Sequence, residues 1–262
     1  MKLPSYRDRY LCAMTPRRIE ALPDKAWAPV LLTVGAVEQH GPHLPVAVDA
    51  IMGQVWVSMT LARLPEGASC YVAPPITIGK SNEHTGFPGT LMIGRDTLRS
   101  QILAVARQAK AWGFTSLAVI NTHGGNVPVL VPTLREIRAQ LGLRAAVLGA
   151  RPITDITPQE ATFGIHAGEI ETSWILAAAG HLVHVDKAVC EFPARLDDPG
   201  QVRPVAAPGL VAWVSRDLSA SGNMGDATLA TAEKGLRWLE LGAAHYASAI
   251  AAICRESRGQ AA

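Results

Sequence analysis

The sequence has little cysteine, and its cysteines are not spaced as pairs. Four occur among 262 residues, far apart from one another: Cys12, Cys70, Cys190 and Cys254. A disulfide framework of the kind found in secreted proteins needs a denser and more regular spacing. The distribution therefore predicts reduced thiols in a cytoplasmic protein.

An excess of charge of either sign is also missing. The 24 lysines and arginines and the 22 acidic residues give a formal net charge of +2. No basic stretch has aromatic residues interleaved with it. Proteins that bind nucleic acid or an anionic membrane surface usually show such a basic excess. Neither nucleic acid nor a membrane is therefore expected as a partner.

Long hydrophobic runs are absent as well. No uninterrupted apolar run approaches the length of a bilayer span. Residues 1–10 contain no apolar core of the kind that a signal peptide carries. We therefore expect a cytoplasmic enzyme without a membrane segment.

What the sequence does contain is a regular alternation of apolar segments. Buried strands are predicted at 29–34, 70–79, 116–120 and 144–148, and helices at 49–64, 96–112, 127–141 and 167–179. This order predicts a layered α/β fold with a mainly parallel sheet. With 48% hydrophobic residues the chain can form a sizeable core.

We expect a single domain over residues 1–262. Its other predicted parts are an N-terminal arm at 1–28 with a helix at 15–22, an irregular segment at 151–164, a loop excursion at 190–224 and a last helix from 226 to 254. The excursion is rich in proline and glycine, which favours a loop over a helix or strand.

Acidic and histidine side chains follow the first predicted strand directly. Glu38 and His40 come four and six residues after Val34, and Asp49 stands at the start of the next predicted helix. Ligands of α/β sheets bind beyond the carboxyl ends of the strands, so this loop is a candidate wall of a metal site. Two alternatives stay open: a polar surface loop with incidental histidines, and Asp49 as a helix N-cap.

Two further loops carry residues of the same types. His123 follows the strand predicted at 116–120, and His166 opens the helix that carries Glu169 and Glu171. A set of histidines and carboxylates without cysteine suits zinc, manganese or iron(II). Two such ions sharing a carboxylate would generate hydroxide at neutral pH and polarise an amide carbonyl.

Other residues near these loops have more than one interpretation. His43 is expected to fix its loop, with metal binding as the alternative. Glu83 and His84 either line the site or hold the loop at 86–89, and we favour the second. The remaining histidines are expected to be structural or on the surface: His181, His184 and His245.

Five motifs together resemble the creatininase (creatinine amidohydrolase) family. They occur in order at 38–45 with Asp49, 84–90, 121–126, 166–173 and 225–235. The resemblance implies a flavodoxin-like three-layer α/β/α sandwich with a dinuclear metal site. It also implies a homo-oligomer, commonly a hexamer built as a trimer of dimers.

The resemblance also assigns roles by position. Glu38 and His123 would bind one metal, His40 the second, and Asp49 would bridge the two. His166 matches the histidine that handles the proton for the leaving nitrogen. The expected cofactors are two divalent ions, zinc first, with manganese or iron(II) as alternatives.

The sequence departs from creatininase itself at two positions. Gly125 stands where the second metal takes a glutamate, and Gly124 stands where creatininase has a tyrosine of its substrate pocket. Glu171 is the nearest acidic candidate to complete the site and to act in catalysis. Its alternative role is a first-turn glutamate stabilised by the helix dipole. Glu169, about 200° away on the same helix, should face elsewhere.

These observations predict a metal-dependent amidohydrolase that cleaves a non-peptide, cyclic C–N amide bond of a small molecule such as a lactam. The alternatives within enzymes are a formamide deformylase and a peptide-trimming maturase of cofactor biosynthesis. The alternative outside enzymes is a non-catalytic protein that binds a metal or a small molecule.

Overall fold

The computed structural model describes residues 6–150, 153–193, 202–203 and 209–261. Its centre is a sheet of four parallel strands, in the order β2-β1-β3-β4. The strands are β1 (Val30–Val34), β2 (Tyr71–Val72), β3 (Ser116–Asn121) and β4 (Arg144–Val147). The predicted mainly parallel sheet is confirmed.

The second strand is much shorter than predicted. A strand was expected at 70–79, but β2 ends at Val72. Pro74 and Pro75 follow almost at once, and proline has no N–H to donate to a neighbouring strand. A single bridge between Val34 and Ile76 continues the contact with β1 beyond the prolines.

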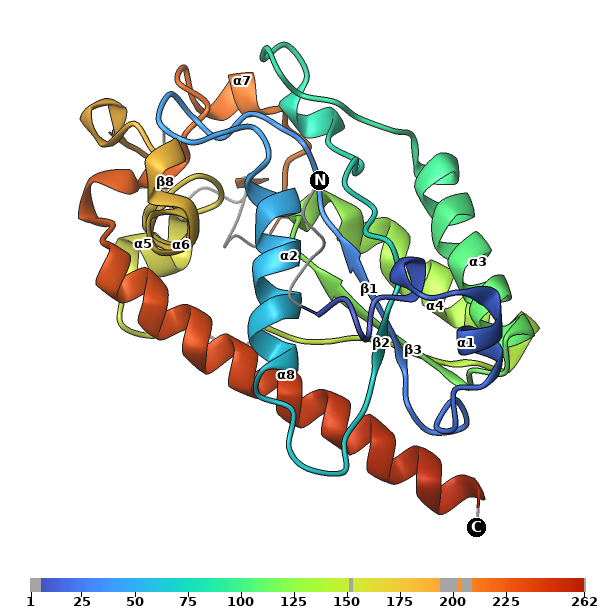
Figure 1. Cartoon of the computed structure of the whole chain (residues 1–262). Coiled ribbons are helices and arrows are strands. Elements are labelled where there is room, and N and C mark those ends of the chain that lie inside the picture. The colour runs from blue at the N-terminus through green and yellow to red at the C-terminus, as the bar shows by residue number, and fades with distance from the viewer. Residues whose placement is uncertain (1–5, 151–152, 194–201, 204–208, 262) are drawn as a thin grey trace.

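Helices cover both faces of the sheet (Figure 1). On one face lie α1 (Pro16–Glu20), α3 (Arg95–Ala111) and α4 (Val127–Leu141); on the other lie α2 (Val48–Leu61), α6 (Glu169–Ala179) and α8 (Ala232–Ala261). Strand side chains alternate between the two layers: Leu32 and Val119 pack on the first side, Leu31 and Ile120 on the second. This arrangement confirms the three-layer α/β/α sandwich.

Shorter elements complete the described chain. They are α5 (Pro158–Phe163), α7 (Ser215–Leu218), the antiparallel pair β5 (Cys190–Glu191) and β8 (Gly225–Asp226), and the parallel pair β6 (Val202–Arg203) and β7 (Gly209–Leu210). Single 3-10 turns occur at Leu11–Ala13, Asn82–His84, Gly124–Asn126, Gly180–Leu182, Val185–Lys187 and Ala227–Leu229. Part of the predicted excursion at 190–224, namely 194–201 and 204–208, lies outside the described residues.

Two predicted boundaries were wrong. The segment at 151–164 contains helix α5, because Thr157 accepts a hydrogen bond from the Glu160 amide at 3.1 Å and Pro158 takes the first helical position. The last helix begins at Ala232, since Asp226 belongs to β8 and its side chain accepts from the amide of Thr228.

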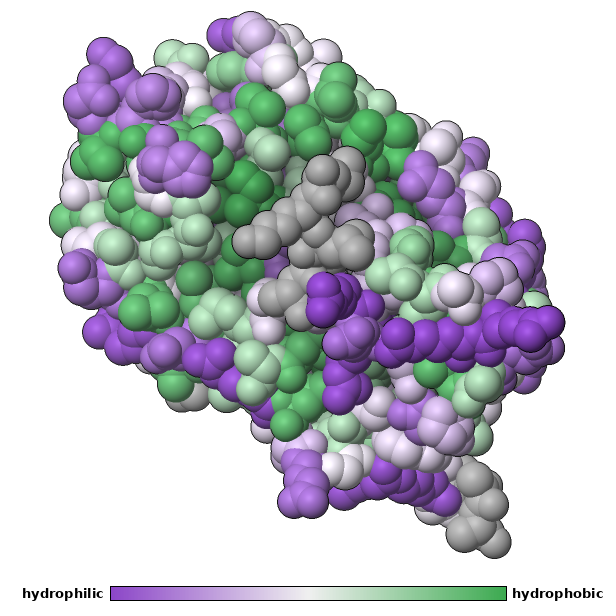
Figure 2. Space-filling view, in the orientation of Figure 1, coloured by the Kyte–Doolittle hydropathy of each residue, from purple (hydrophilic) through white to green (hydrophobic). Residues whose placement is uncertain are grey.

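The polarity of the surface and the unpaired state of the cysteines agree with what the composition predicts. Figure 2 shows apolar side chains gathered where α5 and α6 lie, and hydrophilic side chains over α1. Among the helices described, none combines the length and the apolar content that a bilayer crossing requires. All four cysteines carry free thiols, which confirms the prediction that none is paired in a disulfide.

Candidate metal centre

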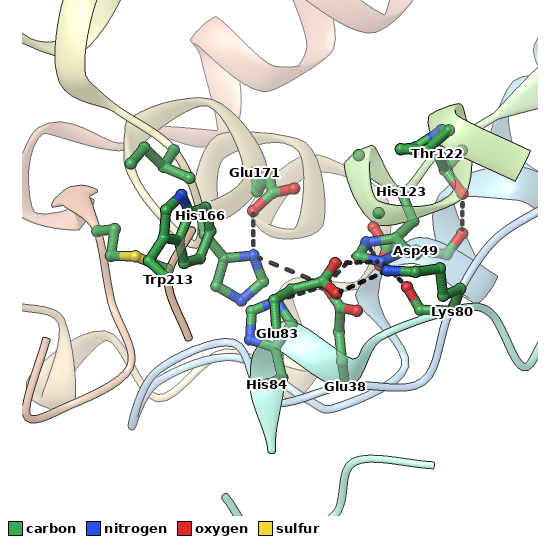
Figure 3. Close-up of a pocket in the computed structure, with 15 residues that line it drawn as sticks. Glu38, Asp49, Lys80, Glu83, His84, Thr122, His123, His166, Glu171 and Trp213 are labelled. Atoms are coloured by element: carbon green, nitrogen blue, oxygen red, sulfur yellow. Dashed lines mark hydrogen bonds and ion pairs between the residues drawn. The ribbon is translucent and has the colours of Figure 1, made fainter. Parts of the chain in front are cut away.

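The predicted acidic and histidine residues meet at the carboxyl end of the sheet. All of them except His40 line a cavity of about 340 Å³ beyond the ends of β1 and β3 (Figure 3). We call the following six residues the ligand cluster: Glu38, His40, Asp49, His123, His166 and Glu171. All but Glu171 are buried, and the side chain of Glu171 is 22% exposed.

Asp49 lies between two histidines. Its Oδ1 atom is 3.9 Å from Nε2 of His40, and its Oδ2 atom is 3.7 Å from Nδ1 of His123. Helix α2 begins at Val48 with Ala47 as its N-cap, so the alternative role of Asp49 as an N-cap is wrong. The carboxylate instead points from the first turn of α2 into the cluster.

Backbone carbonyls determine which ring nitrogen each histidine presents. Nδ1 of His40 donates to the Glu38 carbonyl at 2.9 Å, and Nε2 of His166 donates to the Gln39 carbonyl at 2.6 Å. Nε2 of His123 donates to the Lys80 carbonyl at 3.1 Å. A carbonyl can only accept, so in the neutral ring the other nitrogen carries a lone pair. In all three rings that nitrogen faces the carboxylates of the cluster.

The position of Glu171 is compatible with both of its predicted roles. Its Oε2 atom lies 3.9 Å from both Nε2 of His40 and Nδ1 of His166, and the same atom accepts from the Ala167 amide at 2.6 Å. Glu169 faces away, as predicted, because its Oε1 atom pairs with Nζ of Lys234 at 2.6 Å.

The cluster fits a divalent cation. Four buried atoms of the cluster have no hydrogen-bond partner among the described residues: Oε1 and Oε2 of Glu38, Nε2 of His40 and Oδ2 of Asp49. Leaving such atoms unsatisfied is costly, and a bound cation would satisfy them. Two ligand atoms that share a zinc ion at about 2.0–2.2 Å each lie roughly 3–4 Å apart, as the Asp49 oxygens and the histidine nitrogens do.

Burial and neighbouring charges shift the pKa values of the carboxylates in the cluster. Burial and the charges of Glu38 and Glu171 raise the pKa of Asp49 well above its ordinary value. Burial would raise the pKa of Glu38 too, but its contacts with His123 and His84 bring it below the ordinary range.

The pKa values of two histidines in the cluster shift in opposite directions. Burial, with the nearby charges of His40 and His84, moves the pKa of His166 well below its ordinary value. Burial would lower the pKa of His123 as well, but contacts with Glu38 and Glu83 raise it to about 11.

The preferred interpretation of Glu83 and His84 was wrong. Their side chains do not hold the loop at 86–89 but point into the cavity (Figure 3). Oε1 of Glu83 lies 3.1 Å from Nε2 of His123, and Nε2 of His84 lies 3.3 Å from Oε1 of Glu38. The signal that could have found them is their position after β2, whose carboxyl end lies at the same edge of the sheet.

The other histidines lie as expected. Nε2 of His43 bonds the hydroxyl of Thr172 at 2.8 Å, which ties its loop to α6 and confirms the structural interpretation. The three histidines expected to lie outside the site are exposed: His181, His184 and His245.

Comparison with known proteins identifies relatives over most of the chain. The sequence model of the creatininase family, described as creatinine amidohydrolase, matches residues 13–250. A mycofactocin precursor peptide peptidase of Mycolicibacterium smegmatis is 34% identical over 210 residues, covering 79% of this chain and 78% of that protein. The creatinine amidohydrolase of Pseudomonas putida is 29% identical over 244 residues, covering 84% of this chain and 88% of that protein.

The fold has solved counterparts. A manganese form of creatininase superposes with a TM-score of 0.72 at 25% identity, covering 92% of this chain and 97% of that one. The similarity in structure thus extends over most of the chain.

Proposed function

The chain belongs to the creatininase family, and we propose that it is a metal-dependent hydrolase of an amide C–N bond. One observation carries the proposal: the two oxygens of Asp49 face different histidines, His40 and His123, with buried atoms on both sides unsatisfied. Glu38, His123 and Asp49 would hold one ion, and His40, Asp49 and Glu171 the other.

Ions held there would supply an activated water and a polarised substrate carbonyl. The protein supplies the proton transfer. Nδ1 of His166 carries no proton, faces the cluster and belongs to a ring whose pKa is lowered by burial and by neighbouring histidines. His166 can therefore take a proton from the attacking water and pass it to the departing nitrogen.

We propose zinc as the first candidate metal. Nitrogen and carboxylate oxygen ligands accept zinc, manganese and iron(II), and zinc binds such sites more tightly than manganese or iron(II) does. The relative solved as a manganese form keeps manganese as the alternative. Metal analysis of protein purified without chelators tests the proposal: at least one equivalent is expected. Protein that binds none, and gains no hydrolytic activity from added metal, would support a non-catalytic binding protein.

The cavity supports a small amide as the first candidate substrate. Its volume of about 340 Å³ lies at the lower end of the range for small-molecule sites. Apolar side chains of Ile165, Trp213 and Met224 line it beside the ligand cluster. A compact, partly apolar substrate such as a lactam or another cyclic amide fits these walls.

A peptide is the second candidate, and one comparison favours it. The 34% identical relative is named as a peptidase of a precursor peptide. A chain end could enter the cavity while the rest of the peptide stays outside. Metal-loaded protein should be offered creatinine, other lactams, hydantoins, formamidopyrimidines and short peptides, with products identified by mass spectrometry. Turnover of peptides alone would exclude the small-amide proposal.

We also propose a homo-oligomer, with the hexamer as the expected form. Exposed apolar side chains beyond α6 and on α8 support an interface, with Val185 63% and Leu236 51% exposed. Light scattering coupled to size-exclusion chromatography gives the mass directly. A monomer at micromolar concentration would contradict the proposal.

A further inference from the structure

The carboxylate of Glu83 sits behind His123, on the side of the ring away from the ligand cluster. Its Oε1 atom is 3.1 Å from Nε2 of His123, and its Oε2 atom is 3.6 Å from Nζ of Lys80. The Glu83 side chain is 15% exposed. Glu83 thus contacts the ring nitrogen of His123 that faces away from the cluster, which points to a role behind a ligand.

The space for Glu83 exists because residue 125 is glycine. A Cβ atom added to Gly125 would lie 1.9 Å from Oε1 of Glu83 and 2.4 Å from Nε2 of His123. At the preceding residue, Gly124, an added Cβ would meet nothing within 4 Å. Any side chain at 125 would thus collide with the Glu83 carboxylate. Glycine at position 125, where the sequence differs from creatininase, thus leaves the space that the Glu83 carboxylate occupies.

The hydrogen-bond pattern of His123 gives this arrangement a function. Nε2 faces two groups that can only accept, the Lys80 carbonyl at 3.1 Å and the Glu83 carboxylate at 3.1 Å, with the Ser81 hydroxyl at 3.4 Å, so it carries a proton. Nδ1 points the opposite way, 3.1 Å from Oε1 of Glu38 and 3.7 Å from Oδ2 of Asp49. Metal-binding histidines commonly donate their other ring N–H to a carboxylate or a carbonyl, which fixes the ring orientation.

We propose that Glu83 is a positioning residue for the metal ligand His123. Its carboxylate holds the Nε2 proton, orients the ring and keeps Nδ1 available to an ion between Glu38 and Asp49. This inference rests on the metal site proposed above. Glu83, in the loop after β2, would act on the ion through His123. Glu171, in contrast, lies at the ion site itself.

The alternative is that Glu83 only pairs with Lys80 to stabilise the loop. The contacts separate the two roles, because among the described residues the Lys80 ammonium forms an ion pair with Glu83 and with no carboxylate of the cluster. Lys80→Met removes the partner at 3.6 Å and keeps the Glu83 contact with His123. Glu83→Gln keeps the size of the side chain and removes the charge that faces Nε2.

Metal affinity tests the proposal without an assay of activity. Purified wild type, Glu83→Gln and Lys80→Met are titrated with zinc against a chromophoric chelator, and cobalt-loaded samples are compared by visible absorption. We expect Glu83→Gln to weaken one of the two sites by about 10–100-fold and to change the cobalt spectrum. The zinc affinity of Lys80→Met should stay within about threefold of the wild-type affinity, a much smaller change than that expected for Glu83→Gln. Wild-type zinc affinity in Glu83→Gln, or equal losses in both variants, would overturn the role.

One more variant separates failure of this inference from failure of the metal site. His123→Ala should lose about one zinc equivalent if His123 is a ligand at all. If it keeps both equivalents, the proposed site itself is wrong. If it loses one while Glu83→Gln loses none, the site stands and only the positioning role of Glu83 is rejected. Circular dichroism of each variant establishes that the fold is retained.

Discussion

Glu171 and His40 face each other across the second proposed ion site, with Oε2 of Glu171 3.9 Å from Nε2 of His40. The Nε2 atom is buried without a hydrogen-bond partner, and the same carboxylate oxygen accepts from the Ala167 amide at 2.6 Å. The backbone bond holds the carboxylate at the start of α6, aimed at the histidine. The first-turn position and the approach to the ion site are therefore one arrangement and not alternatives.

Glu171→Gln is expected to lose about one metal equivalent and most activity, because an amide is a much weaker ligand than a carboxylate. The matched control is Glu169→Gln, two residues earlier on α6. Glu169 pairs with Lys234 at 2.6 Å, so this change should lower the free energy of unfolding by about 1–3 kcal/mol while metal content stays normal. Metal analysis and thermal melts of both variants check this. Equal, small effects on metal content would leave Glu171 a helix-end residue.

Asp49→Asn is expected to abolish activity while the fold is retained. The substitution removes the carboxylate that faces both His40 and His123, so occupancy of both ions should fall. Burial and the charges of Glu38 and Glu171 raise the pKa of Asp49, which means that the charged form is disfavoured in the metal-free protein. The metal-free variant should therefore melt at or above the wild-type temperature. Full occupancy with a near-normal rate would contradict a bridging role.

Metal binding should release protons, and metal affinity should rise with pH. In the metal-free protein contacts with Glu38 and Glu83, acting against burial, raise the pKa of His123 to about 11, and the pKa of Asp49 is also raised. His123 holds its proton near neutral pH, the raised pKa of Asp49 favours its protonated form, and a bound ion must displace these protons. Between about pH 6 and about pH 8, affinity should increase by up to about tenfold per pH unit for each proton released. Calorimetry in buffers of different ionisation enthalpy counts the protons, and a buffer-independent heat would refute the expectation.

His166→Gln distinguishes proton transfer from metal binding. If His166 moves the proton, kcat should fall by about 10²–10⁴-fold with metal content unchanged. Its Nδ1 atom also lies 3.9 Å from Oε2 of Glu171 and 3.8 Å from Oε1 of Glu38, within reach of a shared ion. Loss of a metal equivalent in the variant would therefore reassign His166 as a ligand.

Adjacent glycines offer a matched pair of steric variants. Gly125→Ala places a methyl group 1.9 Å from Oε1 of Glu83 and 2.5 Å from the Lys80 carbonyl, so the loop must shift. Gly124→Ala meets nothing within 4 Å. We expect weaker metal binding and a lower melting temperature for Gly125→Ala, and wild-type behaviour for Gly124→Ala. Identical results for the two variants would show that the space at Gly125 is not needed.

Much of the fold follows from local sequence. Helix α4 (Val127–Leu141) occupies the residues predicted at 127–141, and Gly142 ends it with a φ of +68°. The order of strands and helices follows for the same reason, since periodicity, caps and breakers are properties of neighbouring residues. The strand predicted at 70–79 was too long because its apolar composition outweighed Pro74 and Pro75.

The sequence also predicted which loops carry the candidate site. Glu38, His123 and Glu171 each follow a strand or open a helix, and parallel strands bring such positions to one edge of the sheet. It did not determine which atoms face each other. The lone pairs of His40 and His166 are directed by the carbonyls of Glu38 and Gln39, and the second of these bonds joins residues far apart in the chain.

The directions of the Glu83 and His84 side chains could not be predicted without the tertiary structure. Their loop is held against the one that carries Glu38: the Leu91 amide donates to the Val37 carbonyl at 2.8 Å, and the Gln39 amide donates to the Thr90 hydroxyl at 3.0 Å. These contacts join residues more than fifty positions apart and turn both side chains into the cavity. No local pattern encodes that direction, because it depends on how two loops pack and not on the periodicity of either one.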